Sequence, residues 1–141
     1  QWFSPTLPKF FANAPVAAVH ALAYPLGGHY QFAHGLSNSL VLGPVLEFNL
    51  PEAQAPYAQL AHAILPATRS LPESAAARAF VEAMRACVAA MPYAQSLSAA
   101  GVAEADLTML AEDALKVQRL LVNNPRELGL ADALAIYRAA Y

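Results

Sequence analysis

One long stretch of this chain, from Phe10 to Leu46, contains no lysine, arginine, aspartate or glutamate. An uncharged stretch of this length must lie against other apolar atoms, either in a lipid bilayer or in the interior of a protein. Pro15, Pro25, the pair Gly27-Gly28 and three histidines interrupt it every few residues, and a bilayer tolerates such interruptions only where protein surrounds them. We therefore expect a buried helical region and no membrane partner.

Composition limits the kinds of partner that the chain is expected to bind. Its 141 residues suffice for one buried core, and the single Cys87 excludes an internal disulfide and fits a reducing compartment, so we expect a cytoplasmic protein. Eight scattered basic residues and a net charge of −2 give no basic patch for nucleic acid. Only 13% of residues are charged and 57% are hydrophobic, which predicts that part of the surface contacts a partner, for example in a homo-oligomer. The N-terminus shows no signal-peptide pattern.

The spacing of apolar residues predicts an all-α chain, since no segment shows strand alternation with hairpin turns. Asn13 can cap a helix that carries Pro15 in its first turn, and this helix is predicted over residues 16–24, with a break at 25–28. The remaining helices are predicted over 35–49, with a kink at Gly43-Pro44, and then over 51–65, 73–90, 104–117 and 131–140.

The domain organisation predicted from these patterns is simple. Residues 1–10 carry Pro5 and Pro8 and show neither a helical nor a strand period, so we expect an irregular N-terminal arm. Residues 11–141 are expected to form a single helical domain.

Three of the four histidines, His20, His29 and His34, lie inside the uncharged stretch. A neutral imidazole is a good ligand for a divalent transition metal, and apolar surroundings favour the neutral form. His20 is late in one predicted helix and His34 starts the next, so a reversal at Gly27-Gly28 would bring both rings together between the helices. Their spacing matches no compact zinc motif, and a hydrogen-bonded core histidine is the alternative for each of them.

No acidic residue in the stretch adds an oxygen ligand, so two histidines alone leave a metal site incomplete.

Ser37 and Ser39 have no G-x-S-x-G turn or orienting carboxylate, and helix packing explains them better than nucleophilic catalysis. Gly27-Gly28 lacks the G-x-G-x-x-G spacing, so no dinucleotide site is predicted on this chain. Helix capping or a solvated face explains the acidic residues at Glu104, Asp106, Glu112 and Asp113, and no catalytic residue is assigned.

Several short motifs together resemble the iron-containing alcohol dehydrogenases. They begin with HALAYPLGG from His20 to Gly28, HGLSN from His34 to Asn38, and Phe48-Asn49. The later part of the chain is similar to how those enzymes run to their C-terminus, with Gly101-Val102, Asp106-Leu107, NNPRE from Asn123 to Glu127, and Ala135-Ile136-Tyr137. The resemblance extends from about Phe11 to Tyr141.

The resemblance implies the all-α helical bundle that forms the C-terminal domain of dehydroquinate synthase-like and iron-containing alcohol dehydrogenases. In such enzymes an α/β domain binds NAD or NADP, and an aspartate and three histidines hold a divalent metal, Fe²⁺ or Zn²⁺, in the cleft between the domains. The two later histidines match His20 and His34. The aspartate, the first histidine and the nucleotide-binding domain would lie upstream, outside this chain.

The family also implies roles for residues around this site. Tyr24 stands where some members carry a further histidine near the nicotinamide. The resemblance therefore implies that Tyr24 contacts the cofactor, but not that it relays a proton. His29 and Tyr30 are candidates to line the substrate cleft, with ordinary surface loop positions as the alternative. The expected substrate is a small alcohol or aldehyde, and this chain by itself is expected to be inactive. The alternative function is a non-catalytic helical interaction module left by truncation.

Overall fold

The computed structural model describes residues 16–141, and this part of the chain contains helices and their connections and no strand. The all-α prediction is therefore confirmed. The predicted arm over 1–10 and the predicted cap at Asn13 lie outside the described residues. Within residues 16–141, no helix has the length and apolar character needed to cross a bilayer.

The described part comprises seven α-helices and three short 3₁₀ turns. The α-helices are α2 (Val16–Tyr30), α3 (His34–Asn49), α4 (Gln54–Ile64), α5 (Glu73–Ala89), α6 (Leu107–Leu115), α7 (Gln118–Leu121) and α8 (Leu130–Ala140). The 3₁₀ turns are η1 (Leu50–Glu52), η2 (Pro66–Ser70) and η3 (Glu104–Asp106). Four of the amphipathic helices were predicted to within a few residues, while α7 was not predicted.

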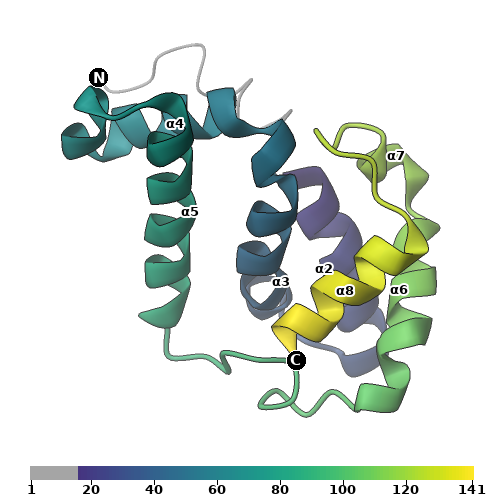
Figure 1. Cartoon of the computed structure of the whole chain (residues 1–141). Coiled ribbons are helices and arrows are strands. Elements are labelled where there is room, and N and C mark those ends of the chain that lie inside the picture. The colour runs from purple at the N-terminus through teal and green to yellow at the C-terminus, as the bar shows by residue number, and fades with distance from the viewer. Residues whose placement is uncertain (1–15) are drawn as a thin grey trace, which may run out of the picture.

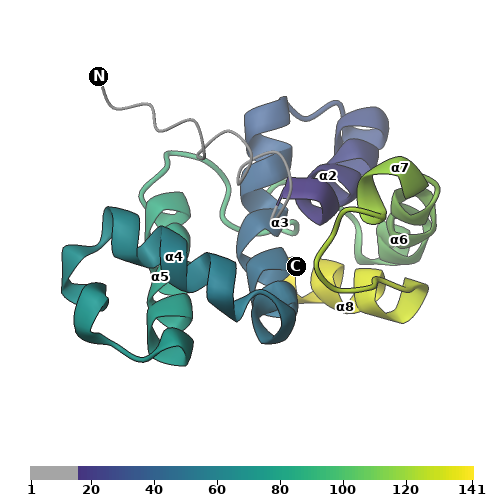
Figure 2. The same ribbon diagram turned by 90° about the horizontal axis from the view of Figure 1, so that it is seen from above.

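Helix α3 lies between two groups of helices (Figures 1 and 2). On one side, α4 and α5 pack on each other and form a small core with the end of α3, around Leu46, Tyr57 and Phe80. On the other side, α2, α6 and α8 form the larger core with α3, around Leu22, Leu110 and similar buried residues. Leu42 of α3 packs against both cores, so α3 joins the two groups.

The predicted break at 25–28 is wrong, because α2 continues through Pro25 and the two glycines to Tyr30. A proline lacks the N–H that would bond to the carbonyl four residues earlier, here that of Ala21. Leu26 is fully buried in the larger core, and this packing offsets part of the cost of the missing helical bond. The chain reverses later, at residues 31–33, where Gln31 has a φ of 55°.

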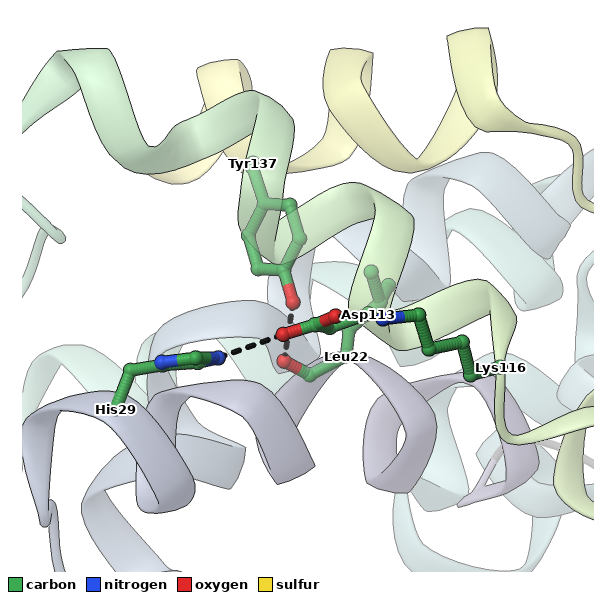
Figure 3. Close-up of polar contacts among 5 residues, drawn as sticks. All are labelled: Leu22, His29, Asp113, Lys116 and Tyr137. Carbon is green, nitrogen blue, oxygen red and sulfur yellow. Dashed lines mark hydrogen bonds and ion pairs between the residues drawn. The ribbon is translucent and has the colours of Figure 1, made fainter.

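Polar contacts join α2 to α6 and α8 through Leu22, which precedes that proline, and His29, which follows it (Figure 3). The hydroxyl of Tyr137 donates a hydrogen bond of 2.6 Å to the carbonyl of Leu22, and burial raises the pKa of Tyr137. Asp113 was predicted on a solvated face. It instead lies between two basic groups, with its carboxylate 2.6 Å from the His29 Nε2 atom and 2.6 Å from the Lys116 Nζ atom.

These contacts predict how stability depends on pH. Lys116 and, to a smaller extent, His29 lower the pKa of Asp113. A carboxyl whose pKa is lower in the folded state stabilises that state above the unfolded pKa of about 4, and this stabilisation is lost as pH falls through the folded value. The unfolding free energies of the unmodified chain and Asp113→Asn should therefore differ near neutral pH and converge as the pH falls below about 4. Urea unfolding from pH 2.5 to 7 measures this difference; a gap that does not narrow in acid contradicts the prediction.

Candidate metal centre

The two predicted ligand histidines lie side by side. Their ring centroids are 5.4 Å apart and the ring planes make an angle of 66°. His20 belongs to the second turn of α2 and His34 is the first residue of α3. The predicted reversal at Gly27-Gly28 does not bring them together; the turn at residues 31–33 does, because it lays α3 back along α2.

A neighbouring amide fixes the environment of the second ring. The Nδ2 atom of Asn38, one helical turn after His34, lies 3.0 Å from the His34 Nε2 atom. When the amide donates this hydrogen bond, the Nε2 atom is the unprotonated nitrogen of the neutral ring, and its lone pair accepts the bond. A metal bound at this nitrogen would take the place of that hydrogen bond.

The described residues bring two candidate ligand side chains, His20 and His34, together at this point. Within residues 16–141, no group of three or more histidine, cysteine, aspartate or glutamate side chains is close enough to hold a metal ion. A catalytic metal commonly takes three or more protein ligands. A further histidine, cysteine or carboxylate ligand would therefore come from outside the described residues.

An open hollow lies beside His34, between α2 and α3. Its lining includes Tyr24, Gly27, Gly28 and Ser37. Tyr24 is 68% exposed, so its ring is accessible at the edge of the hollow. The glycines add no side chains, and a Cβ atom built at Gly28 would meet nothing within 4 Å, which shows that the wall here is open.

His29 and Tyr30 belong to the last turn of α2 and not to a connecting loop, which corrects their predicted placement. Both have partners in the later part of the chain. His29 contacts Asp113, and the Tyr30 hydroxyl donates to Asp106 and accepts the backbone N–H of Ala103 at 3.2 Å. The hydrogen bond to Asp106 raises the pKa of Tyr30. Neither residue lines the hollow beside His34, and substrate contact by them stays a prediction.

A second polar cluster was not predicted. Asn49, at the end of α3, is fully buried and exchanges two hydrogen bonds with Asn124, at 3.0 and 2.8 Å. Arg126 donates to the carbonyl of Phe48 at 2.8 Å, and its guanidinium carbon lies 4.1 Å from the centroid of the Phe48 ring. These contacts join two of the motifs quoted above. Hydrophobic spacing gives no signal for them, since the partners are far apart in sequence.

Comparison with known proteins gives a consistent result. The family model described as the C-terminal part of the Fe-containing alcohol dehydrogenase family matches residues 9–141. Long-chain-alcohol dehydrogenase 1 of Geobacillus thermodenitrificans is 38% identical over 93% of this chain and 33% of its own length. The 1,3-propanediol dehydrogenase of Citrobacter freundii is 34% identical over 93% of this chain and 34% of its own, and lactaldehyde reductase of Escherichia coli K12 is 30% identical over the same shares.

Solved structures agree with this result. A crystal structure of 1,3-propanediol oxidoreductase superposes with a TM-score of 0.82 at 31% identity, covering 88% of this chain and 32% of that one. An alcohol dehydrogenase from Oenococcus oeni gives a TM-score of 0.80 at 32% identity, covering 87% and 32%. The chain thus spans about a third of the length of these relatives.

Proposed function

This chain belongs to the Fe-containing alcohol dehydrogenase family, whose C-terminal part it matches, and on that premise we propose that His20 and His34 hold a divalent metal in an NAD(P)-linked alcohol dehydrogenase. The relatives above include a long-chain-alcohol dehydrogenase and a 1,3-propanediol dehydrogenase, both oxidoreductases. The observation that carries the proposal is the approach of the two rings, 5.4 Å apart on adjacent helices. Imidazole is a suitable ligand for both Fe²⁺ and Zn²⁺.

The two histidines fit this role through their surroundings. The half-buried His20 lies between Val19 and Ala21, which are buried, so its backbone is fixed by the larger core. His34 is exposed, and its Nε2 atom, which lies 3.0 Å from the Asn38 amide nitrogen, would exchange that hydrogen bond for the metal. When bound, a divalent metal supplies Lewis-acid stabilisation of negative charge on an alcohol oxygen. The side chains of this chain would hold that ion and leave its remaining positions to ligands from elsewhere and to the substrate.

The same geometry supports a role for Tyr24 in binding the nicotinamide cofactor. Tyr24 follows His20 by one helical turn, so both side chains lie on the same face of α2. Its ring is largely exposed at the edge of the hollow beside His34, and a planar nicotinamide can stack on an exposed aromatic face. In this proposal a nucleotide-binding domain is the partner that covers this face. The names of the relatives include long-chain alcohols, 1,3-propanediol and lactaldehyde, so membership of the family leaves the substrate open.

Calorimetric titration of the metal-stripped chain with Zn²⁺, and anaerobically with Fe²⁺, tests the proposal. We expect one ion to bind per chain, and His20→Ala and His34→Ala each to weaken binding by about tenfold or more, since about 1.4 kcal/mol corresponds to a factor of ten. The double variant should show no specific binding. His62→Ala is the matched control, because His62 lies on α4, in the other group of helices. Binding that is absent in the unmodified chain, or unchanged in the double variant, contradicts the proposal.

A further inference from the structure

We propose that Asn38 is a third metal ligand of this chain and binds the ion through its side-chain oxygen, beside His20 and His34. The inference rests on the proposed function, because that function places a divalent metal at the two histidines. It goes beyond that function by adding an oxygen ligand to the two ring nitrogens.

The first observation is the position of Asn38 on its helix. His34 and Asn38 are four residues apart on α3, so their side chains lie on the same face of the helix, one turn apart. Two side chains at this spacing can bind one ion, as the two histidines of the H-E-x-x-H motif do. The first turns of α3 can therefore supply two ligands, and His20 of α2, whose ring lies beside that of His34, supplies another.

The second observation is a distance. The Nδ2 atom of Asn38 lies 3.0 Å from the Nε2 atom of His34. Two ligand atoms that each lie about 2.1 Å from one ion are roughly 3.0–3.4 Å apart when the angle at the ion is about 90–110°. A half-turn about the Cβ–Cγ bond of Asn38 puts its oxygen where its nitrogen now lies. The two side chains therefore already have the separation of neighbouring ligands.

The third observation is that the oxygen of Asn38 is unused. Its Oδ1 atom is buried and has no hydrogen-bond partner among the described residues. Nearly all buried polar atoms in proteins are paired, so this oxygen calls for an explanation. A metal at the Nε2 atom of His34 would also take away the acceptor of the Asn38 amide. Turning Oδ1 toward the ion then gives this side chain a partner that it otherwise lacks.

The chemistry of the three groups is compatible with one ion. Imidazole nitrogen suits Fe²⁺ and Zn²⁺, and an amide oxygen adds a harder ligand that carries no charge. Three protein ligands are the number that catalytic zinc sites commonly have. The other coordination positions stay open to ligands from outside the described residues and to the alcohol.

Calorimetric titration of the metal-stripped chain with Zn²⁺ at pH 7 tests the inference with two substitutions at the same position. Asn38→Ala removes the oxygen and should weaken binding by about tenfold or more, since even the loss of groups behind the ligands costs about that much. Asn38→Asp keeps an oxygen but has no N–H to donate, and it should bind Zn²⁺ at least as tightly as the unmodified chain. If the amide acted only by donating to His34, both substitutions would weaken binding.

Nuclear magnetic resonance on the ¹³C-labelled chain observes the side chain directly. Addition of Zn²⁺ should shift the Cγ signal of Asn38 and leave that of Asn123 in place, because Asn123 is an exposed asparagine far along the chain from both histidines. Asn123→Ala is the matched control for the titration and should bind Zn²⁺ as the unmodified chain does. The helical circular dichroism signal shows that each variant is folded.

The outcomes separate this inference from the proposed function. Unchanged binding in Asn38→Ala, equal losses in Asn38→Ala and Asn38→Asp, or an Asn38 Cγ signal that Zn²⁺ does not move would each overturn the third ligand. The proposed function stays intact in those cases as long as the variants of His20 and His34 lose the metal. If the unmodified chain binds no Zn²⁺, the proposed function fails, and the inference fails with it.

Discussion

Replacing Leu26 with alanine should lower the free energy of unfolding by about 2–5 kcal/mol. Leu26 is fully buried in the larger core, one residue after the proline inside α2. The loss combines the transfer free energy of the removed carbons with the cost of the cavity that remains. Against a typical total stability of about 5–15 kcal/mol, this is a large fraction. Urea unfolding followed by the helical circular dichroism signal measures it.

Leu130→Ala provides the control, because Leu130 begins α8 and is 43% exposed. It should change stability by no more than about 0.5 kcal/mol. Equal effects of the two substitutions would mean that the segment after Pro25 is not packed against the core, and that the predicted loop at 25–28 describes it better than a helix does.

The difference between the predicted and observed ends of α2 has a physical explanation. Proline and paired glycines are strong local breakers, and a prediction from sequence follows them. Helix α2 is apolar on nearly all sides, so no stripe shows where its contact with the core ends. Helix α5, predicted over 73–90, has an apolar face and a charged face, and its observed bounds are Glu73–Ala89. Periodicity therefore located both ends of the amphipathic α5, whereas for α2 it gave no sign of where the helix ends.

The candidate site was predictable in part. The residue type and the position of His20 and His34 on successive helices indicated that the rings could meet, although the turn that joins the helices lies three residues beyond the predicted one. The contact between His29 and Asp113 was not predictable, because the partners are 84 residues apart. A charge pattern along one helix describes neighbours on that helix alone, and α2 and α6 come together only through their packed apolar faces.

Replacing Asn49 with alanine should lower the free energy of unfolding by about 2–4 kcal/mol, because a buried amide partner is left unpaired and a cavity forms. Asn49 is fully buried, and its two hydrogen bonds to Asn124 join the end of α3 to the segment after α7. Asn124 also donates a hydrogen bond to the carbonyl of Arg126 at 2.6 Å. Removing the Asn49 amide therefore disturbs a connected set of hydrogen bonds. Denaturant unfolding at neutral pH measures the change.

A double-mutant cycle then separates the pair from its surroundings. Asn124→Ala removes the other amide, and the double variant should be more stable than the sum of the single losses predicts, with a coupling of about 0.5–3 kcal/mol. Asn123→Ala is the control, since Asn123 is exposed and should cost no more than about 0.5 kcal/mol. Strictly additive losses would contradict the reciprocal amide contact. A measured coupling would instead mean that Phe48-Asn49 and residues 123–127 stabilise the fold as one unit, which explains in physical terms why both motifs occur together in this chain.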